Sequence, residues 1–491
     1  MAKQKTYSTI EKLMKKIAIP LFFLILTISL NAQNKQWTLE EAINKALEEN
    51  ISVKQGQLDV ELADIDKLNA IGNYLPSFNV SGSNSWNTGL TQNITTGVLQ
   101  NQTTRNFSAN ATLGITIFDG LNNLRQAQRA KLSKLAAQFN LKQIEDNTAL
   151  LVANAYLEIL FNKENLAVIK AQHKITSEQL ERSNQLVDAG SIPRGDLLEI
   201  QSTSANEEQR IVVAENNIRI SLINLAQIIQ IKDYENFDIA ESSYEAPLTD
   251  ITEKTPEEII AKAKAERPEL QIAEANIALA EKDVQIARSN YYPNLEGFIN
   301  YNTRESGADR ILQGGVDPNQ PTQVIGQVED TGQTVVAPNF GLLTSPPAPF
   351  FEQLYLNDGI SYGLQLNIPI LNGFSTRASV QRNKINVKRA EFQKEQAELE
   401  LESNVYQAYT DVLGARKAYQ AAMVAVQAQE QAYQYSTDRF DVGLLNSFDF
   451  SQAKFRLENA QSEALRAKYD YIFKIKVLEL YFGIPATELK F

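Results

Sequence analysis

In NFSANATLGITI, residues 106–117, every second residue is apolar. The residues in between are Asn, Ser, Thr and Gly, none of them charged. A period of two places the apolar side chains on one face of a β-strand and the polar ones on the other. About 11 residues are enough to cross a bilayer at a tilt, and an uncharged polar face suits a wet lumen. A strand of a soluble sandwich would alternate in the same way, so this pattern alone does not decide between the two.

The same kind of strand recurs in ISYGLQLNIPI, residues 360–370, because the chain contains two copies of one unit. At an offset of 217 residues, Asn73-Tyr74-Leu75-Pro76 corresponds to Asn290-Tyr291-Tyr292-Pro293. At an offset of 253, Phe118-Asp119-Gly120 corresponds to Leu371-Asn372-Gly373. Internal duplication of this kind indicates two structural repeats in one chain.

The second copy carries extra residues, which must lie between Tyr301 and Gly359. This stretch holds adjacent glycines and six prolines: Pro318, Pro321, Pro338, Pro346, Pro347 and Pro349. Such a composition predicts a long exposed loop. We expect the loop at 303–358 to be either without fixed structure or ordered as a lid.

Long helices dominate the rest of the chain. Each copy is predicted to open with a helix, at about 38–72 and 256–290, which ends before a proline. Residues 121–189 contain neither proline nor glycine, and 374–442 contain only Gly414. At about 1.5 Å per residue each of these helices would be roughly 100 Å long. Their apolar residues step by three and four, the spacing of helices packed side by side in a coiled coil.

Each long helix is predicted to reverse in a short turn. Gly190 and Gly443 fit the left-handed C-cap that ends many helices. Asp196 with Glu199, and Asp449 with Gln452, have the spacing of capping boxes at the start of the return helices, 196–231 and 449–482.

These elements define an expected domain map. The first repeat covers 34–237, with a β-hairpin at about 76–118 and a helical hairpin at about 121–231. A polar linker follows at 238–255. The second repeat covers 256–491, with a β-hairpin at about 293–371 and a helical hairpin at about 374–482.

The N-terminus has the pattern of a secretory signal. Lys15 and Lys16 precede an apolar run from Ile17 to Leu30, and Ala32 is a small residue near a cleavage site. We expect residues 1–33 to be removed, with translation starting at Met1 or at Met14. An uncleaved anchor helix is the alternative. No other segment is apolar over the length of a membrane helix, so entry of the mature chain into a membrane would require a β-barrel.

Composition excludes several classes of function. The chain has no cysteine and one histidine, which excludes thiol chemistry, Cys-ligated metals and disulfides. The single His173 lies on a polar helical stretch, and we expect it to be a surface residue. A formal net charge of −12 disfavours nucleic-acid binding. We expect no catalytic residue, no metal site and no cofactor. The C-terminal Phe491 is a weak candidate for an assembly signal.

Four membrane-length strands cannot close into a barrel. An open edge in lipid leaves backbone N–H and C=O groups unpaired, at several kcal/mol each. Spanning barrels begin at about eight strands. The chain is therefore expected to form an oligomer of two, three or four copies.

Taken together, these motifs resemble the outer membrane efflux protein family, the TolC-like channels. The resemblance covers about residues 38–485. It is carried by Asn73-Tyr74-Leu75-Pro76 before the strands, Ile117-Phe118-Asp119-Gly120 after them, and the turns at Gly190 and Gly443. It implies a mostly α chain with a β membrane part: a homotrimer with a 12-stranded β-barrel in the outer membrane, continued by a long α-helical barrel into the periplasm.

The resemblance also implies a function. Members of the family are passive, gated conduits that export small molecules or proteins across the outer membrane. They accept cargo from an inner-membrane pump, of the RND or ABC type, through a periplasmic adaptor protein. The expected partners are therefore two further copies of the chain, the adaptor, the pump and outer-membrane lipid. The pump supplies the energy, so the resemblance implies no cofactor.

The helix turns are the sites that the resemblance singles out. In the family they form the periplasmic tip, where the tunnel narrows and the adaptor docks. By position the docking tips here are Gly190, Ser191, Ile192, Gly443, Leu444 and Leu445. Some relatives carry aspartates just past the second tip, which form an anionic ring at the entrance.

Asp449 occupies the first position of such a ring, but Gln452 occupies the next, which puts a double ring in doubt. The matching residues of the first copy are Asp196 and Glu199. Helix capping alone is the alternative role for Asp196 and Asp449.

Other classes of function compete with a channel. Long helices with a membrane anchor also build structural coiled-coil stalks and adhesins, although these need neither a duplicated hairpin nor a polar lumen face. A soluble coiled-coil scaffold is a further alternative. An envelope enzyme is disfavoured by the missing catalytic groups.

Overall fold

The computed structural model describes residues 35–92, 99–240, 250–312, 315–340 and 343–485. The predicted signal peptide and Phe491 lie outside these residues. The chain divides into two compact units. The helical unit comprises Met1–Ala63, Leu132–Ala278 and Lys388–Phe491, and the sheet unit comprises Asp64–Lys131 and Leu279–Val387.

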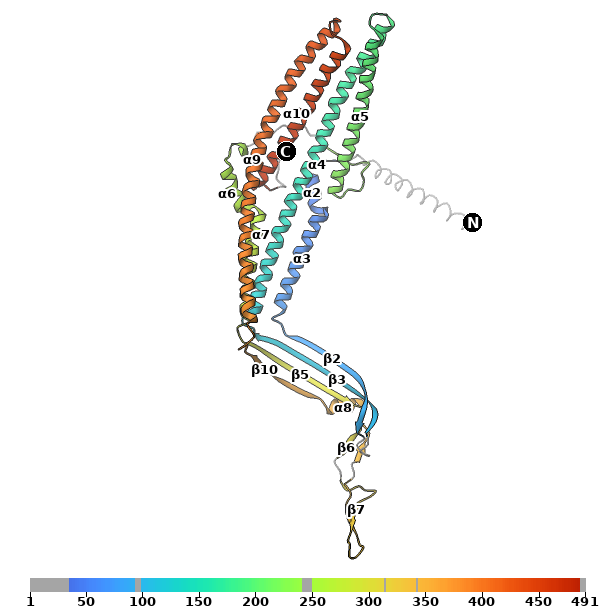
Figure 1. Cartoon of the computed structure of the whole chain (residues 1–491), viewed down its shortest axis with the longest axis vertical. Helices are drawn as coiled ribbons and strands as arrows, with labels where there is room; N and C mark the ends of the chain where they lie inside the picture. The colour runs from blue at the N-terminus through green and yellow to red at the C-terminus, as the bar shows by residue number, and fades with distance from the viewer. Residues whose placement is uncertain (1–34, 93–98, 241–249, 313–314, 341–342, 486–491) are drawn as a thin grey trace, which may run out of the picture. The chain divides into compact units, whose positions relative to one another are not determined.

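The sheet unit is built on four antiparallel strands (Figure 1). They are β2 (Ser77–Gln92), β3 (Leu99–Phe118), β5 (Asn294–Ser306) and β10 (Gly359–Asn367), in the spatial order β10-β5-β3-β2. The two inner strands come from different repeats, so the sheet joins both halves of the sequence.

The register places the apolar residues of all four strands on one face. Leu113 of β3 lies opposite Phe78 of β2 and Ile299 of β5, and Ile299 lies opposite Tyr362 of β10. In the single chain this face is open: Phe78 is 67% exposed and Tyr362 is 80% exposed. An apolar surface of this extent marks contact with lipid or protein.

The strands differ from their predicted lengths. In the first repeat β3 has 20 residues and is longer than the alternating stretch at 106–117 that predicted it, and its partner β2 has 16 residues. In the second repeat β10 ends at Asn367, before the predicted end at Ile370. Pro369 explains the early end, because proline has no N–H to donate to a β-ladder.

The long insertion of the second repeat contains regular structure. Its described residues include two ladders, β6 (Arg310–Leu312) with β9 (Leu343–Ser345) and β7 (Thr322–Gln327) with β8 (Thr334–Pro338). A short helix, α8 (Phe350–Leu356), follows. The alternative without fixed structure is therefore wrong for these residues.

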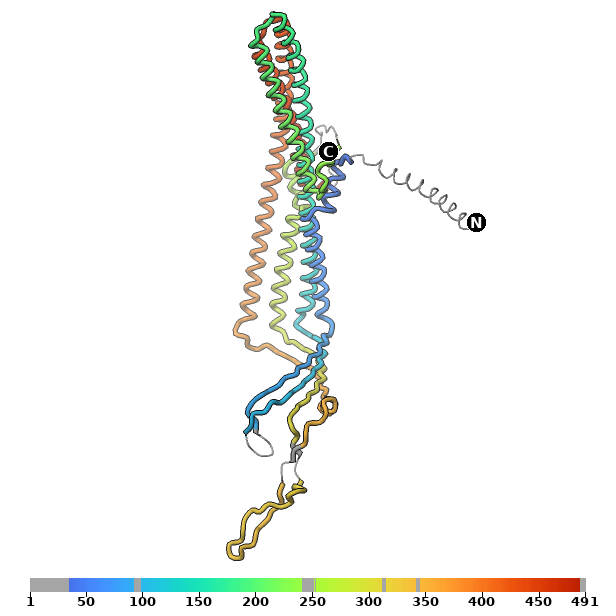
Figure 2. The backbone as a smooth tube through the Cα atoms, turned by 90° about the vertical axis from the view of Figure 1, so that its right-hand side faces the viewer, coloured from blue at the N-terminus to red at the C-terminus, as the bar shows by residue number. Residues whose placement is uncertain are grey.

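Two long helical hairpins run through the helical unit (Figure 2). They are α4 (Asn122–Asp188) with α5 (Arg194–Ile228), and α9 (Ser375–Asp441) with α10 (Ser447–Tyr481). The helices α4 and α9 have 67 residues each, within a residue or two of the predicted bounds. Among the helices of the described residues, none combines the length and the apolar character that a membrane span requires.

Two cores stabilise the helical unit, and α10 contributes to both. One core packs α2 (Leu39–Glu49), α4 and α5 around Tyr156 and Leu225, each 0% exposed. The other packs α6 (Pro256–Glu266) and α9 around Val405. Ile472 of α10 belongs to the first core and Ile475 to the second. Residues three apart on α10 therefore hold the two hairpins together.

The opening helix of each repeat is broken in two, so the predictions of single helices at 38–72 and 256–290 are wrong. The second pieces are α3 (Ile51–Gly72) and α7 (Pro268–Ser289). The break at Arg267 follows from Pro268, which disfavours a helical residue before it. The break at Asn50 has a side-chain cause, because Asn50 Oδ1 accepts from Ser52 N at 2.9 Å while its Nδ2 donates to the Ile228 carbonyl at 3.0 Å.

The start of the predicted linker at 238–255 belongs to the core. The strand β4 (Asp238–Ile239) pairs in parallel with β1 (Gln36–Trp37), and Ile239 is 0% exposed. The Tyr156 hydroxyl donates to the carbonyls of Trp37 and Ala240, at 3.1 and 3.0 Å. A polar composition around residue 240 therefore concealed a short buried strand.

The turn that leads from strand to long helix is the same in both repeats. Gly120 and Leu121 have φ values of 68° and 67°, and Gly373 and Phe374 have values of 59° and 62°. A Cβ added at Gly120 would lie 2.6 Å from the Ser289 carbonyl oxygen, whereas one at Gly373 would meet nothing within 4 Å. Only the first glycine is held by close backbone packing.

This difference makes a testable pair of substitutions. Gly120→Ala should lower the free energy of unfolding by roughly 3 kcal/mol, because backbone strain adds to a collision with a backbone atom. Gly373→Ala should cost only the strain of positive φ, about 1 kcal/mol. Urea titrations in detergent, followed by circular dichroism, measure both. Equal losses for the two variants would contradict the close approach at Gly120.

Candidate functional site

The two helix turns lie at the same end of the helical unit (Figures 1 and 2). Gly190 and Gly443 have φ values of 72° and 75°, which confirms them as left-handed C-caps. The N–H of Ser191 donates to the Leu186 carbonyl at 2.8 Å, and Leu444 N–H donates to the Arg439 carbonyl at the same distance. These bonds close the last helical turn, so each hairpin ends in a compact tip.

The predicted docking residues are largely open to solvent. Gly190, Ser191 and Gly443 are exposed, and Leu444 is 70% exposed. Ile192 and Leu445 are half-buried. The tips thus present small and apolar residues with free space around both glycines.

The predicted capping boxes are wrong, because both return helices begin earlier. The first, α5, begins after Pro193, which makes no side-chain cap, and Asp196 lies in its first turn. The second, α10, is capped by Asn446, whose Oδ1 accepts from Asp449 N at 2.8 Å. The Asp449 carboxylate in turn accepts from Asn446 Nδ2 at 3.0 Å. Both aspartates still lie where the positive end of the helix dipole favours a negative charge.

Two of the four predicted entrance residues share a cleft between α5 and α10. It has a volume of about 310 Å³ and is lined by Glu199 and Gln452 together with the exposed rings of Phe448 and Phe455. Asp196 and Asp449 do not line it. The structure therefore brings together the second residue of each predicted pair and leaves the first residues on the tips.

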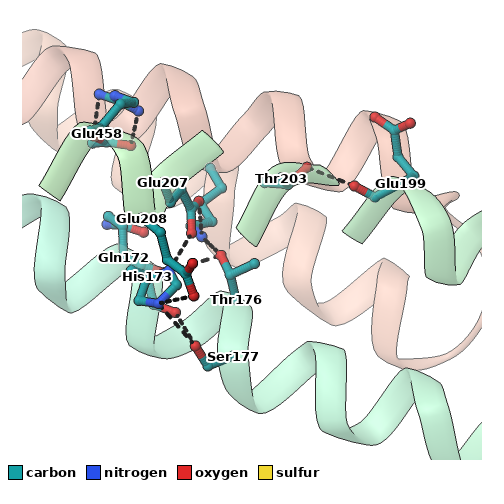
Figure 3. Close-up of polar contacts among 11 residues, drawn as sticks. Gln172, His173, Thr176, Ser177, Glu199, Thr203, Glu207, Glu208 and Glu458 are labelled. Carbon is teal, nitrogen blue, oxygen red and sulfur yellow. Dashed lines mark hydrogen bonds and ion pairs between the residues drawn. The ribbon is translucent and has the colours of Figure 1, made fainter. Parts of the chain in front are cut away.

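Glu207, Arg210 and Glu458 also line this cleft, and they belong to a buried polar network that joins three helices (Figure 3). Lys454 of α10 is 2% exposed, and its Nζ donates to Glu207 Oε1 of α5 at 2.6 Å and to Thr176 Oγ1 of α4. Glu458, 1% exposed, accepts from Arg210 Nη1 at 3.0 Å. Buried charges of this kind persist only when they are paired.

His173 belongs to this network, so its prediction as a surface residue is wrong. Its side chain is 20% exposed, and its Nδ1 lies 3.5 Å from Glu207 Oε2. Both of these atoms are buried without a hydrogen bond. Figure 3 shows His173 and Thr176 of α4 directed toward Glu207 of α5. The polar helical stretch that suggested exposure is in fact one side of a helix interface.

Burial changes the titration of two members of the network. It lowers the pKa of the Lys454 ammonium, against the opposing effect of the bond to Glu207. It raises the pKa of Glu458, against the attraction of Arg210. Because the pKa of Glu458 is higher in the folded state than in the unfolded state, protonation of this carboxyl favours folding. The stabilisation is complete at a pH below the pKa of the unfolded state, and it is lost as the pH rises through the pKa of the folded state.

The described residues contain no group of three or more His, Cys, Asp or Glu side chains arranged to hold a metal ion. The arrangement at the tips is instead one of positioning and charge. Exposed carboxylates stand at the helix starts, and paired charges lie between the hairpins. Such an arrangement can hold helices together and attract cations.

The network was missed in the sequence although a signal for it exists. Phe450, Lys454 and Leu457 step by four and three, so Lys454 occupies a position where a coiled coil carries an apolar residue. Ile200, Ser204 and Glu207 follow the same spacing on α5. Charged residues at such positions on two helices indicate a buried pair.

Three comparisons relate the chain to known proteins. The family described as "Outer membrane efflux protein" matches residues 42–229 and 259–482, one stretch in each repeat. The outer membrane protein TolC of Vibrio cholerae is 24% identical over 342 residues, which are 68% of this chain and 66% of that protein. The match thus spans slightly less than two thirds of this relative.

Solved structures share the fold. A membrane protein from Pseudomonas aeruginosa superposes with a TM-score of 0.68 at 14% identity, over 92% of this chain and 91% of that one. The CmeC outer membrane channel of Campylobacter jejuni gives a TM-score of 0.67 at 15% identity, over 93% and 86%. At these identities the likenesses concern the fold alone.

The buried network yields a second prediction. Lys454→Met should lower the free energy of unfolding by about 3 kcal/mol, because it leaves Glu207 buried without its cation. The double variant Lys454→Met/Glu207→Met should recover most of this loss. Lys474→Met, which removes an exposed pair with Asp470, should cost at most about 0.5 kcal/mol. Urea unfolding in detergent measures all three, and a double variant no more stable than Lys454→Met would refute the pairing.

Proposed function

The chain belongs to the outer membrane efflux protein family, and from this premise we propose that it is the outer-membrane channel subunit of a tripartite efflux or type I secretion system. In this role it is a passive, gated conduit for small molecules or proteins. The observation that carries the proposal is the family match in both repeats, on a chain whose four strands present one continuous apolar face. The repeats, at 34–237 and 256–491, are proposed as its two structural domains.

The open edges of the sheet support a trimer. Among the strands of the sheet, β2 and β10 each have a partner on one side only. In lipid, the free N–H and C=O groups of such an edge cost several kcal/mol each. If β10 of one copy pairs with β2 of the next, three copies close a barrel of 12 strands with no remaining edge. The exposed apolar residues then face lipid and the polar residues face the lumen.

The helical hairpins support a helical tunnel. Each copy contributes two hairpins, and the long helices α4 and α9 continue directly from the turns that end the sheet. Three copies would supply 12 helices around one axis. Such a tunnel extends into the periplasm, where members of this family lie.

The helix tips are the proposed docking site for a periplasmic adaptor that links the channel to an inner-membrane RND or ABC pump. The exposed Leu444 and the small residues Gly190, Ser191 and Gly443 leave room for a partner helix to approach. Ile192 and Leu445 complete the apolar tips. The pump supplies the energy, and the channel itself requires no cofactor.

Asp449 is proposed as the charge that selects ions at the entrance. It is exposed at the start of α10, and its carboxylate is fixed by Asn446. Three copies around a narrow axis would form an anionic ring, which favours cations. Asp196, Glu199 and Gln452 would lie nearby as polar residues of the same entrance.

Conductance tests the channel against the alternative of a coiled-coil stalk. The mature chain, purified as an oligomer and added to a planar bilayer, should give discrete conductance steps. Arg182→Ala removes the 3.0 Å bond from Arg182 to Asp441, which joins the two hairpins near their tips, and it should make the openings larger or more frequent. The heat-denatured protein is the control. A membrane-inserted oligomer that never conducts, even with this substitution, would favour the stalk.

Cation selectivity tests the role of Asp449. Asp449→Asn should lower the cation-to-anion permeability ratio several-fold, measured from reversal potentials in a salt gradient, because it removes three charges from the narrowest part of the pore. Asp330→Asn is the matched control, since Asp330 is also exposed but lies in the insertion of the sheet unit. Unchanged selectivity of the Asp449 variant would remove this residue from the entrance.

A further inference from the structure

The short helix α8 of the insertion is fixed to one strand of the sheet. The strand β10 pairs with β5 only as far as Asn302, so beyond this residue β5 has an edge without a strand partner. Gln353 of α8 takes the place of that partner. Its Oε1 accepts from Ser306 N, and its Nε2 donates to the Ser306 carbonyl, both at 3.1 Å.

Two further bonds hold α8 against the same edge. Asn357 Nδ2 donates to the Arg304 carbonyl at 2.9 Å, and Thr303 Oγ1 donates to the Leu354 carbonyl at 2.6 Å. Gln353 is 4% exposed, so this attachment is shielded from water. The helix is therefore a fixed part of the sheet unit.

The register shows that α8 reaches over the apolar face of the sheet. Glu305 of β5 lies opposite Phe107 of β3, and Phe107 belongs to the apolar series that defines this face. The ring of Phe350, the first residue of α8, lies 5.1 Å from the ring of Phe107. The Arg105 guanidinium lies 5.4 Å from Phe350 and pairs with Glu305 at 2.7 Å.

The opposite side of α8 is aromatic and open. Phe351 is 80% exposed and Tyr355 is 79% exposed, and residues four apart share one side of a helix. The Phe351 ring lies 5.3 Å from that of Phe350, so the exposed rings continue the aromatic contact that begins on the sheet. Among large side chains, aromatic residues are uncommon choices for a surface that faces only water.

The position of α8 along the strands indicates what its exposed rings contact. Trp86 of β2 lies opposite Arg105, on the same face and at the same level, and it is 63% exposed. Between Trp86 and Phe78 this face of β2 carries Val80, Gly82 and Asn84, opposite Ala111, Ala109 and Phe107 of β3. Spanning barrels carry aromatic girdles where their apolar band meets the headgroups, because aromatic rings favour that boundary. Trp86, Phe351 and Tyr355 mark such a boundary, with the Arg105–Glu305 ion pair beside it.

We propose that α8 is a membrane-interface anchor, whose Phe351 and Tyr355 rings enter the headgroup region of the outer leaflet and fix the level of the insertion above it. The proposal rests on the proposed function, since it requires the apolar face of the sheet to contact lipid. The chemistry of the partner is that of a lipid surface, apolar below and polar above. A neighbouring copy of the chain is the competing occupant.

The absence of cysteine from the sequence makes a direct test possible. Phe351→Cys and Tyr355→Cys, each carrying a nitroxide spin label, are reconstituted as full-length oligomers in vesicles of phosphatidylethanolamine and phosphatidylglycerol. Two reference labels accompany them. Leu364→Cys lies on the apolar face of β10, and Tyr435→Cys lies on α9 with a comparable exposure of 69%. Power-saturation measurements give the accessibility of each label to oxygen, which dissolves in lipid, and to a nickel chelate, which stays in water.

The expected result is a ratio of oxygen to nickel accessibility at residues 351 and 355 several-fold above that at residue 435. Adding Gln353→Leu, which releases α8 from Ser306, should lower the ratio at residue 355. Labels at 351 and 355 that match residue 435 would overturn the proposal in favour of water. Labels shielded from both reagents would overturn it in favour of a neighbouring copy. If the label at residue 364 is itself open to the nickel chelate, the lipid-facing sheet fails and the proposed function fails with it.

Discussion

The structure depends on one constraint: every backbone N–H and C=O group of the four-stranded sheet needs a partner. Within one chain, β3 and β5 meet this requirement by pairing across the two repeats. At the C-terminal end of β5, Gln353 of α8 supplies the partners for the backbone of Ser306. The outer edges of β2 and β10 have no such partner in the sheet. In the proposed channel, neighbouring copies of the chain supply these partners, and the apolar face of the sheet contacts lipid.

Duplication gives the chain two similar repeats, and their tertiary contacts differ. The turns at Gly120 and Gly373 have the same backbone conformation, yet only Gly120 is pressed against another segment of backbone. Both opening helices break in the middle, one at a residue before proline and the other at a side-chain bond of Asn50. The long insertion is specific to the second repeat. The same local backbone conformation in the two repeats is therefore packed against different neighbours.

The buried network at Lys454 carries a desolvation penalty, and it fixes the alignment of the helices along one another. An apolar seam alone tolerates sliding of one helix along another, because leucine and alanine pack in several alignments. Lys454 with Glu207, and Arg210 with Glu458, penalise any alignment that separates a buried charge from its partner. The network lies next to the cleft that contains Glu199 and Gln452, so it fixes the helices that carry the proposed entrance.

Sequence patterns predicted the elements whose cause is local. Period-two alternation located β3 and β10, long stretches without proline and nearly without glycine set the bounds of α4 and α9, and Gly190 and Gly443 located the turns. The sequence patterns did not reveal the break at Asn50, the buried strand around Ile239, or the half-buried position of His173 beside Glu207. These depend on partners distant in the chain, and no pattern within one segment reports which atoms a second segment will place beside it.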